Sequence, residues 1–144
     1  MKKLNSVLFS IGLIISFLAG VLHFFVPYVF AWYSYIPEAP QEIYASIDYV
    51  NFFFSLLLAS LSLILLYSKK KIFSGSKEIL VFYLLLVFTW FCRVIITIII
   101  PWPTFLQTWL MVGFSTEFII TLIPAIYLLK NNKSDISKVY ERIE

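Results

Sequence analysis

Residues 78–100 read EILVFYLLLVFTWFCRVIITIII, an apolar run whose interior carries one charge, that of Arg93. At a rise of about 1.5 Å per residue, a helix of this length crosses the hydrocarbon core of a bilayer. The apolar composition therefore predicts a transmembrane helix over residues 78–100, with a cation held inside the membrane. Pro101 and Pro103 follow directly and end the run, because proline cannot continue a helix.

Three further apolar runs have the length of a membrane span, and they cover residues 4–27, 42–67 and 105–129. The whole chain is 61% hydrophobic and only 13% charged, far from the balance of a soluble domain. We therefore expect an all-α fold, a four-transmembrane-helix bundle that forms one integral membrane domain over residues 1–144. Such a chain is a multi-pass membrane protein in contact with the lipid bilayer.

Basic residues lie in three short polar stretches, which hold ten of the eleven Lys and Arg residues: positions 2–3, 69–77 and 130–142. Basic loops stay on the cytoplasmic side, so the N and C termini and the middle loop are predicted to be cytoplasmic, in the cell membrane. The loop at residues 36–42 carries two acids and no base, as expected outside. The net charge of +3 is explained by cytoplasmic loops beside anionic lipid, and no nucleic-acid partner is indicated. The polar tail at residues 130–144 is either a short surface helix or disordered.

Small and polar residues recur at helical spacing in every predicted span, which places them on one face of each helix. Faces of this kind let helices approach closely in a membrane, so we expect all four to point into the bundle. The four sets are Gly12, Ser16 and Gly20; Asp48, Asn51, Ser55 and Ser62; Thr89, Arg93 and Thr97; and Gly113, Glu117 and Thr121.

Ionisable residues within these faces define the candidate site. Arg93 lies about 10 Å below the outer end of its predicted helix, and the other ionisable groups also fall at mid-depth or in the outer half. An unpaired charge at the helix centre costs about 2.5–3.5 kcal/mol, so Arg93 is predicted to pair with Glu117 or Asp48. The sequence thus indicates a ligand-binding or ion-pair cluster, formed by His23, Asp48, Asn51, Arg93 and Glu117. The alternative is a structural ion-pair network that only sets the register of the helices.

The charges of this cluster do not balance. Two carboxylates, one guanidinium and a neutral imidazole sum to minus one. A proton on Glu117 or His23, a bound cation or access to external water would supply the missing charge. Cys92 is the only cysteine and His23 the only histidine, so we assign no metal site and no bis-histidine haem site. No catalytic residue is assigned.

The first outer segment carries the pattern Gly20-x-x-His23-Phe24-x-x-Pro27-x-x-Phe30, followed by Ile36-Pro37-x-x-Pro40 and then Ser46. Over about a third of the chain, this pattern resembles the DoxX-like family of small four-helix integral membrane proteins. The resemblance implies a four-helix bundle with an accessory role. The name-giving members of the family are subunits of a membrane thiosulfate:quinone oxidoreductase.

Three classes of function fit these observations. The first is an accessory or binding subunit that holds a lipophilic ligand or a partner membrane protein at the charged cluster. For such a ligand, quinone and lipid are the classes left open. The second is a homodimeric transporter of small molecules coupled to protons. The third is a membrane-embedded enzyme that modifies lipid, with Glu117 and His23 as acid and base, but no catalytic motif supports it. The sequence favours the first class and leans away from an enzyme.

Overall fold

The computed structural model describes the backbone of residues 1–140 and the side chains of residues 1–131. All regular structure in this part of the chain is helical. Four helices are long: α1 (Lys2–His23), α3 (Gln41–Tyr67), α5 (Lys77–Ile99) and α6 (Leu106–Tyr140). The short elements are α2 (Val26–Val29), the 3₁₀ helix η1 (Trp32–Tyr35) and α4 (Lys69–Phe73).

Each of the four long helices is long and apolar enough to cross a membrane, α6 over residues Leu106–Asn131. The described part of the chain therefore confirms the prediction of an all-α fold with four helices able to span a membrane. The first predicted span is too long by four residues at its end, because α1 ends at His23 and Pro27 lies in the first turn of the separate short helix α2, which begins at Val26. A proline is well suited to the first turn of a helix but not to its interior. The polar tail continues α6 as a helix to Tyr140, and its last residues lie outside the described part.

Helix α1 lies between α3 on one side and α6 on the other, and α5 packs mainly on α6. Two glycines make these approaches possible. A Cβ on Gly20 would lie 2.7 Å from the backbone nitrogen of Ala59 in α3, and one on Gly12 would lie 2.8 Å from Cγ2 of Thr121 in α6. Gly12, Ser16 and Gly20 are all buried, so the predicted packing face of the first helix is confirmed.

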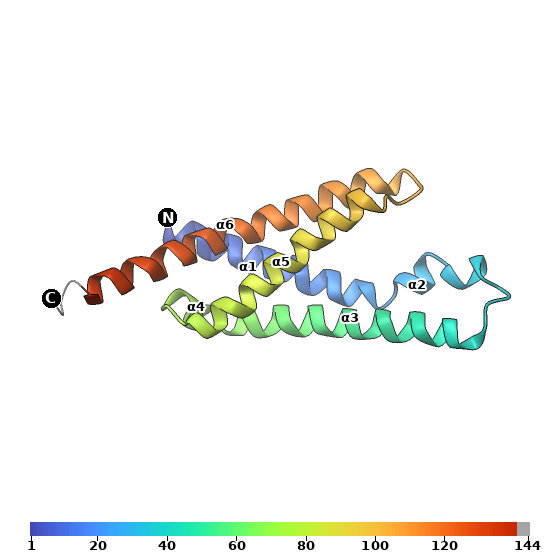
Figure 1. Ribbon diagram of the computed structural model, residues 1–144, viewed down its shortest axis with the longest axis horizontal. Coiled ribbons are helices and arrows are strands. Elements are labelled where there is room, and N and C mark those ends of the chain that lie inside the picture. The colour runs from blue at the N-terminus through green and yellow to red at the C-terminus, as the bar shows by residue number, and fades with distance from the viewer. Residues whose placement is uncertain (141–144) are drawn as a thin grey trace.

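The four long helices form two pairs that diverge along the molecule. Figure 1 shows α1 with α3 and α5 with α6 separating toward the end that carries η1 and the α5–α6 loop. The apolar core lies toward the opposite end, at α4, where Phe9, Leu65 and Tyr83 are fully buried. At the open end, the rings of Phe30 and Trp102 bridge the two pairs, with centroids 5.9 Å apart. The bundle is thus closed beside α4 and hollow beside η1.

This divergence corrects two of the predicted inward positions. Asn51, Ser55 and Ser62 of α3 are buried as predicted, but Asp48 is exposed. In α6 Glu117 and Thr121 are buried, whereas Gly113 is exposed and a Cβ there would meet no atom within 4 Å. Both exceptions lie in the half of their helix nearer the open end, where the two helix pairs have separated.

Candidate functional site

The structure divides the five predicted site residues among three places. His23, Asn51 and Arg93 line one cavity. Glu117 lies in a hydrogen-bonded network inside the bundle. Asp48 lies outside both, at the outer surface of α3. The sequence predicted these five residues as one cluster, whereas the structure divides them into three separate groups.

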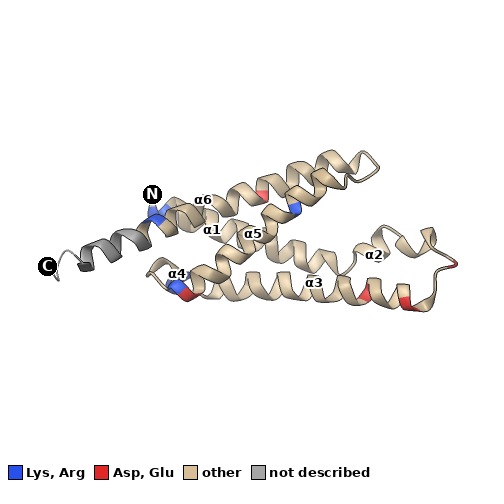
Figure 2. Cartoon of the chain, in the orientation of Figure 1, with Lys and Arg blue, Asp and Glu red and all other residues tan. Residues whose placement is uncertain are grey.

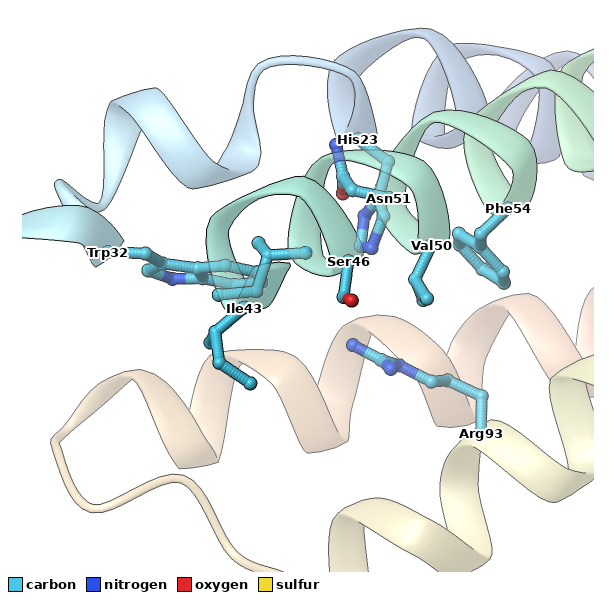
Figure 3. Close-up of a pocket in the computed structure, with 9 residues that line it drawn as sticks. His23, Trp32, Ile43, Ser46, Val50, Asn51, Phe54 and Arg93 are labelled. Atoms are coloured by element: carbon cyan, nitrogen blue, oxygen red, sulfur yellow. The ribbon is translucent and has the colours of Figure 1, made fainter. Parts of the chain in front are cut away.

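The cavity, called here the outer cavity, has a volume of about 550 Å³ and lies between α3 and α5 at the open end of the bundle. Figure 3 shows that its polar groups come from different elements, with His23 at the end of α1, Asn51 on α3 and Arg93 on α5. The remaining walls are mostly apolar. The lining residues are His23, Trp32, Ile43, Ser46, Ile47, Val50, Asn51, Phe54 and Arg93.

Arg93 is half-buried, and its side chain extends from α5 toward α3 (Figure 3). The guanidinium carbon lies 4.8 Å from the centroid of the Phe114 ring, a cation–π distance. Among the described side chains, no carboxylate lies within ion-pair distance of Arg93. The ion pair expected from the sequence is not formed, because Glu117 and Asp48 are engaged elsewhere.

Glu117 belongs to a buried network of three side chains from three helices. The Ser16 hydroxyl donates to Oε1 of Glu117 at 2.7 Å, and the Trp90 indole N–H donates to Oγ of Ser16 at 2.8 Å. Glu117 is only 2% exposed, and its other oxygen, Oε2, has no hydrogen-bond partner. Next to it, the Tyr83 hydroxyl donates to the backbone carbonyl of Thr121 at 2.8 Å. These bonds tie α1, α5 and α6 together in the closed part of the bundle.

Asp48 connects α3 to the outer segment instead of reaching Arg93. Its carboxylate accepts a hydrogen bond from the hydroxyl of Tyr33 in η1, and this bond raises the pKa of Tyr33 to about 12. Nearby, the hydroxyl of Tyr44 donates to the backbone carbonyl of Ile36 at 2.5 Å, and the rings of Tyr33 and Tyr44 lie 5.5 Å apart. Asp48 therefore helps to fix the segment that carries η1 against α3.

His23 and Asn51 hold the end of α1 against α3. The His23 ring lies 4.8 Å from the ring of Phe54, and the Asn51 amide donates to the backbone carbonyl of Phe24 across a long 3.4 Å. In the described part of the chain, the His23 imidazole makes no hydrogen bond. Both polar groups thus lie on the wall of the cavity with hydrogen-bonding capacity to spare.

Two further spaces adjoin the outer cavity on opposite sides, one smaller and one larger than the cavity itself. Toward the bundle centre, it shares Phe54 and Arg93 with a hollow of about 210 Å³, the inner hollow, whose walls include Leu58, Trp90 and Ile96. Toward the outer end, it shares Trp32 and Ile47 with a hollow of about 680 Å³, the rim hollow. The walls of the rim hollow include Phe30, Trp102 and Phe105. The three spaces follow one another along the boundary between the two helix pairs.

The sequence did not identify the apolar walls of the outer cavity. Ile43, Ile47, Val50 and Phe54 recur at the spacing of one helix face, so a periodic signal was present in the sequence. That signal does not tell a cavity wall from a lipid-facing stripe, because both are apolar. Ser46 was noted only as part of the family pattern.

No group of three or more His, Cys, Asp or Glu residues close enough to hold a metal ion occurs in the described part of the chain. The chain matches no protein-family model, no curated protein and no solved structure. The resemblance to the DoxX-like family therefore stays a prediction, and the function has to be argued from the cavity itself.

Proposed function

We propose that this protein is an accessory or binding protein of the cell membrane that holds a lipophilic molecule in the outer cavity. The observation that carries the proposal is the cavity of about 550 Å³ between α3 and α5, whose walls are mostly apolar and include the polar side chains of His23, Ser46, Asn51 and Arg93. Ligand sites in proteins have this character, since apolar walls supply affinity and a few polar groups orient the ligand. Here His23, Asn51 and Arg93 are the orienting groups.

The lipophilic character of the ligand follows from where the cavity opens. Two of its wall residues on α3, Ile43 and Val50, are 47% and 72% exposed. On a helix that crosses a bilayer, an exposed apolar side chain faces lipid, so the cavity is reached sideways from the membrane. Quinone and lipid are the ligand classes that suit such an entrance. The same opening would also accept the side chains of a partner membrane protein or of a second copy of this chain.

We place the cavity in the outer leaflet, with both termini in the cytoplasm. Apart from Arg93, the described Lys and Arg residues are at the α4 end of the bundle, away from the cavity (Figure 2). Basic residues on one side support this orientation.

Labelling of single cysteines tests this orientation. In a variant without Cys92, a cysteine at Glu38 should react with an impermeant thiol reagent from outside. A cysteine at Gly75 should react only after permeabilisation, and external labelling there would reverse the orientation.

A proton-coupled transporter is the second candidate, because Glu117 is buried with one carboxyl oxygen unpartnered. Carboxyl groups inside membranes often serve in proton relays. However, Glu117 does not line the outer cavity, and its Oε1 accepts a hydrogen bond within the packed part of the bundle. A substrate in the cavity would not touch it, so the binding role is the better supported of the two.

The binding role is tested by filling the cavity. Ile47 lines both the outer cavity and the rim hollow, so Ile47→Trp should exclude the ligand. The control is Leu57→Trp on the same helix, because Leu57 is 68% exposed and lines neither space. Mass spectrometry of the purified proteins should detect a lipophilic molecule in the parent and in Leu57→Trp. It should be lost from Ile47→Trp, which should still unfold in one cooperative thermal transition.

Equal amounts of the molecule in all three proteins would contradict the proposal, and so would the absence of any retained lipophilic molecule from the parent. A second polypeptide that is retained by the parent and lost only from Ile47→Trp would instead assign the cavity to a partner protein.

A further inference from the structure

We infer that the molecule held in the outer cavity is a lipid with an anionic head, and that its negatively charged oxygens bind Arg93. This inference rests on the proposed function and names its ligand class. The charges around the cavity carry it. Arg93 is the charged side chain on the cavity wall, and the other polar groups there are His23, Ser46 and Asn51.

Among the residues that the structure describes, no acidic side chain lines the cavity. The two carboxylates that could have neutralised Arg93 are engaged elsewhere, since Glu117 accepts a hydrogen bond from Ser16 and Asp48 accepts one from Tyr33. The cavity therefore has a positive charge that the described part of the chain leaves without a counter-ion. A negatively charged group entering it would supply the missing partner.

The guanidinium group also suits this ligand by geometry. It presents a planar fork of N–H donors that binds the two oxygens of a phosphate or carboxylate together. Figure 3 shows Arg93 reaching across the cavity toward α3, where Ser46 and Asn51 lie. The Asn51 amide is held only by the 3.4 Å bond to Phe24, so it is available as a second donor to an oxyanion. A neutral quinone would leave the charge of Arg93 uncompensated.

The inner hollow receives the part of a hydrocarbon chain that lies next to the head, and the rest of the chain lies in the bilayer. This hollow meets the outer cavity at Phe54 and Arg93 and continues toward the bundle centre between Leu58 and Trp90. A lipid of the outer leaflet has its head outward and its chains toward the midplane, and this sequence of spaces has the same direction. The rim hollow, with Trp32 and Trp102 on its walls, leaves room for the rest of the head.

The test compares head groups in a bilayer of known composition. The protein is reconstituted in nanodiscs of phosphatidylcholine with a minor fraction of phosphatidylglycerol, and the lipids that stay bound are counted by native mass spectrometry. The parent should retain phosphatidylglycerol about tenfold over phosphatidylcholine after correction for composition, a difference of about 1.4 kcal/mol. Both heads carry a phosphate, but the choline cation neutralises that of phosphatidylcholine, so only phosphatidylglycerol brings a net negative charge to Arg93. Oleate should be retained if a carboxylate serves as well as a phosphate.

Arg93→Gln should reduce the preference for phosphatidylglycerol to about twofold or less, because the side chain loses its charge but stays polar. Arg93→Lys should retain part of the preference, because the lysine ammonium keeps the positive charge but lacks the planar set of N–H donors of the guanidinium. Asn51→Ala keeps the charge and removes one donor, so it should lower the preference about threefold and gives a second variant that is independent of Arg93. The control is Lys70→Gln in α4, which removes a charge away from the cavity and should change nothing.

Each contrary result has a distinct meaning. Lipid retained without preference for head charge in the parent would overturn the inference and leave the proposed function standing. No retained lipid or other lipophilic molecule would overturn both. If inorganic phosphate at millimolar concentration displaced the bound lipid head, or bound equally well without lipid, the site would belong to a free anion and the lipid assignment would be wrong.

Discussion

The buried network and the outer cavity place similar residues in opposite situations. In the network, Glu117, Ser16 and Trp90 bond to one another where glycines bring the helices into contact. In the cavity, Arg93, His23 and Asn51 lie on walls that have separated, and no carboxylate of the described side chains pairs with the arginine. Polar residues inside a membrane hold helices together where backbones meet. Where the helices diverge, the same types of residue keep spare hydrogen-bonding capacity and can bind a ligand.

The largest effect should come from a side chain placed where the helices meet. A Cβ on Gly20 would lie 2.7 Å from a backbone atom of Ala59, which cannot move without shifting α3. Gly20→Val should therefore destabilise the protein by about 3 kcal/mol, measured by thermal or denaturant unfolding in detergent. Gly113→Val is the matched control, because nothing lies within 4 Å of its Cβ, and it should change stability by less than about 0.5 kcal/mol. Equal losses in the two variants would remove the contrast between a closed and an open part.

A smaller effect is expected from breaking the network itself. Ser16→Ala removes the hydroxyl that links Trp90 to Glu117, so it leaves an indole N–H and a second carboxyl oxygen buried without partners. The cost should be about 2 kcal/mol. Ser55→Ala is the control, since Ser55 is equally buried but bonds only to the backbone carbonyl of Asn51 in its own helix, and it should cost about 0.5 kcal/mol. A loss at Ser16 no greater than that at Ser55 would mean that the network contributes nothing beyond packing.

The smallest effect should appear in the coupling between Arg93 and Glu117. The unfolding free energies of Arg93→Leu, Glu117→Gln and the double variant form a cycle whose interaction term should be below about 0.5 kcal/mol, because the two residues share no contact. Arg93→Leu alone should change stability by about 1 kcal/mol or less. A buried ion pair would behave differently, with a loss of about 3–5 kcal/mol for removing one partner. Such a loss, recovered in the double variant, would restore the ion-pair interpretation and remove the charge argument for an anionic lipid.

The sequence predicted the helices because each depends on its own residues. A run such as residues 78–100 is apolar enough to enter a bilayer whatever its neighbours do, and α5 covers Lys77–Ile99. The glycine spacing in α1 was equally readable, since Gly12 and Gly20 lie on one face of any helix. The break after His23 was missed because the apolar run continues through Pro27 without a change in composition.

The partners of the charges were decided only by the tertiary structure. The position of a residue along its helix follows from the sequence. Arg93 and Glu117 are at similar depths in neighbouring helices, and for this reason the sequence predicts that they form an ion pair. Whether they do depends on how α5 and α6 rotate and tilt, which follows from close contacts such as Gly12 against Thr121 and from the bond between Trp90 and Ser16. These contacts turn Glu117 toward α1, while the divergence of the pairs leaves Arg93 facing α3. The sequence by itself determined which residues are polar inside the membrane. Helix packing determined which of them bond to each other and which face the cavity, because side-chain direction depends on the angles between helices that are distant along the chain.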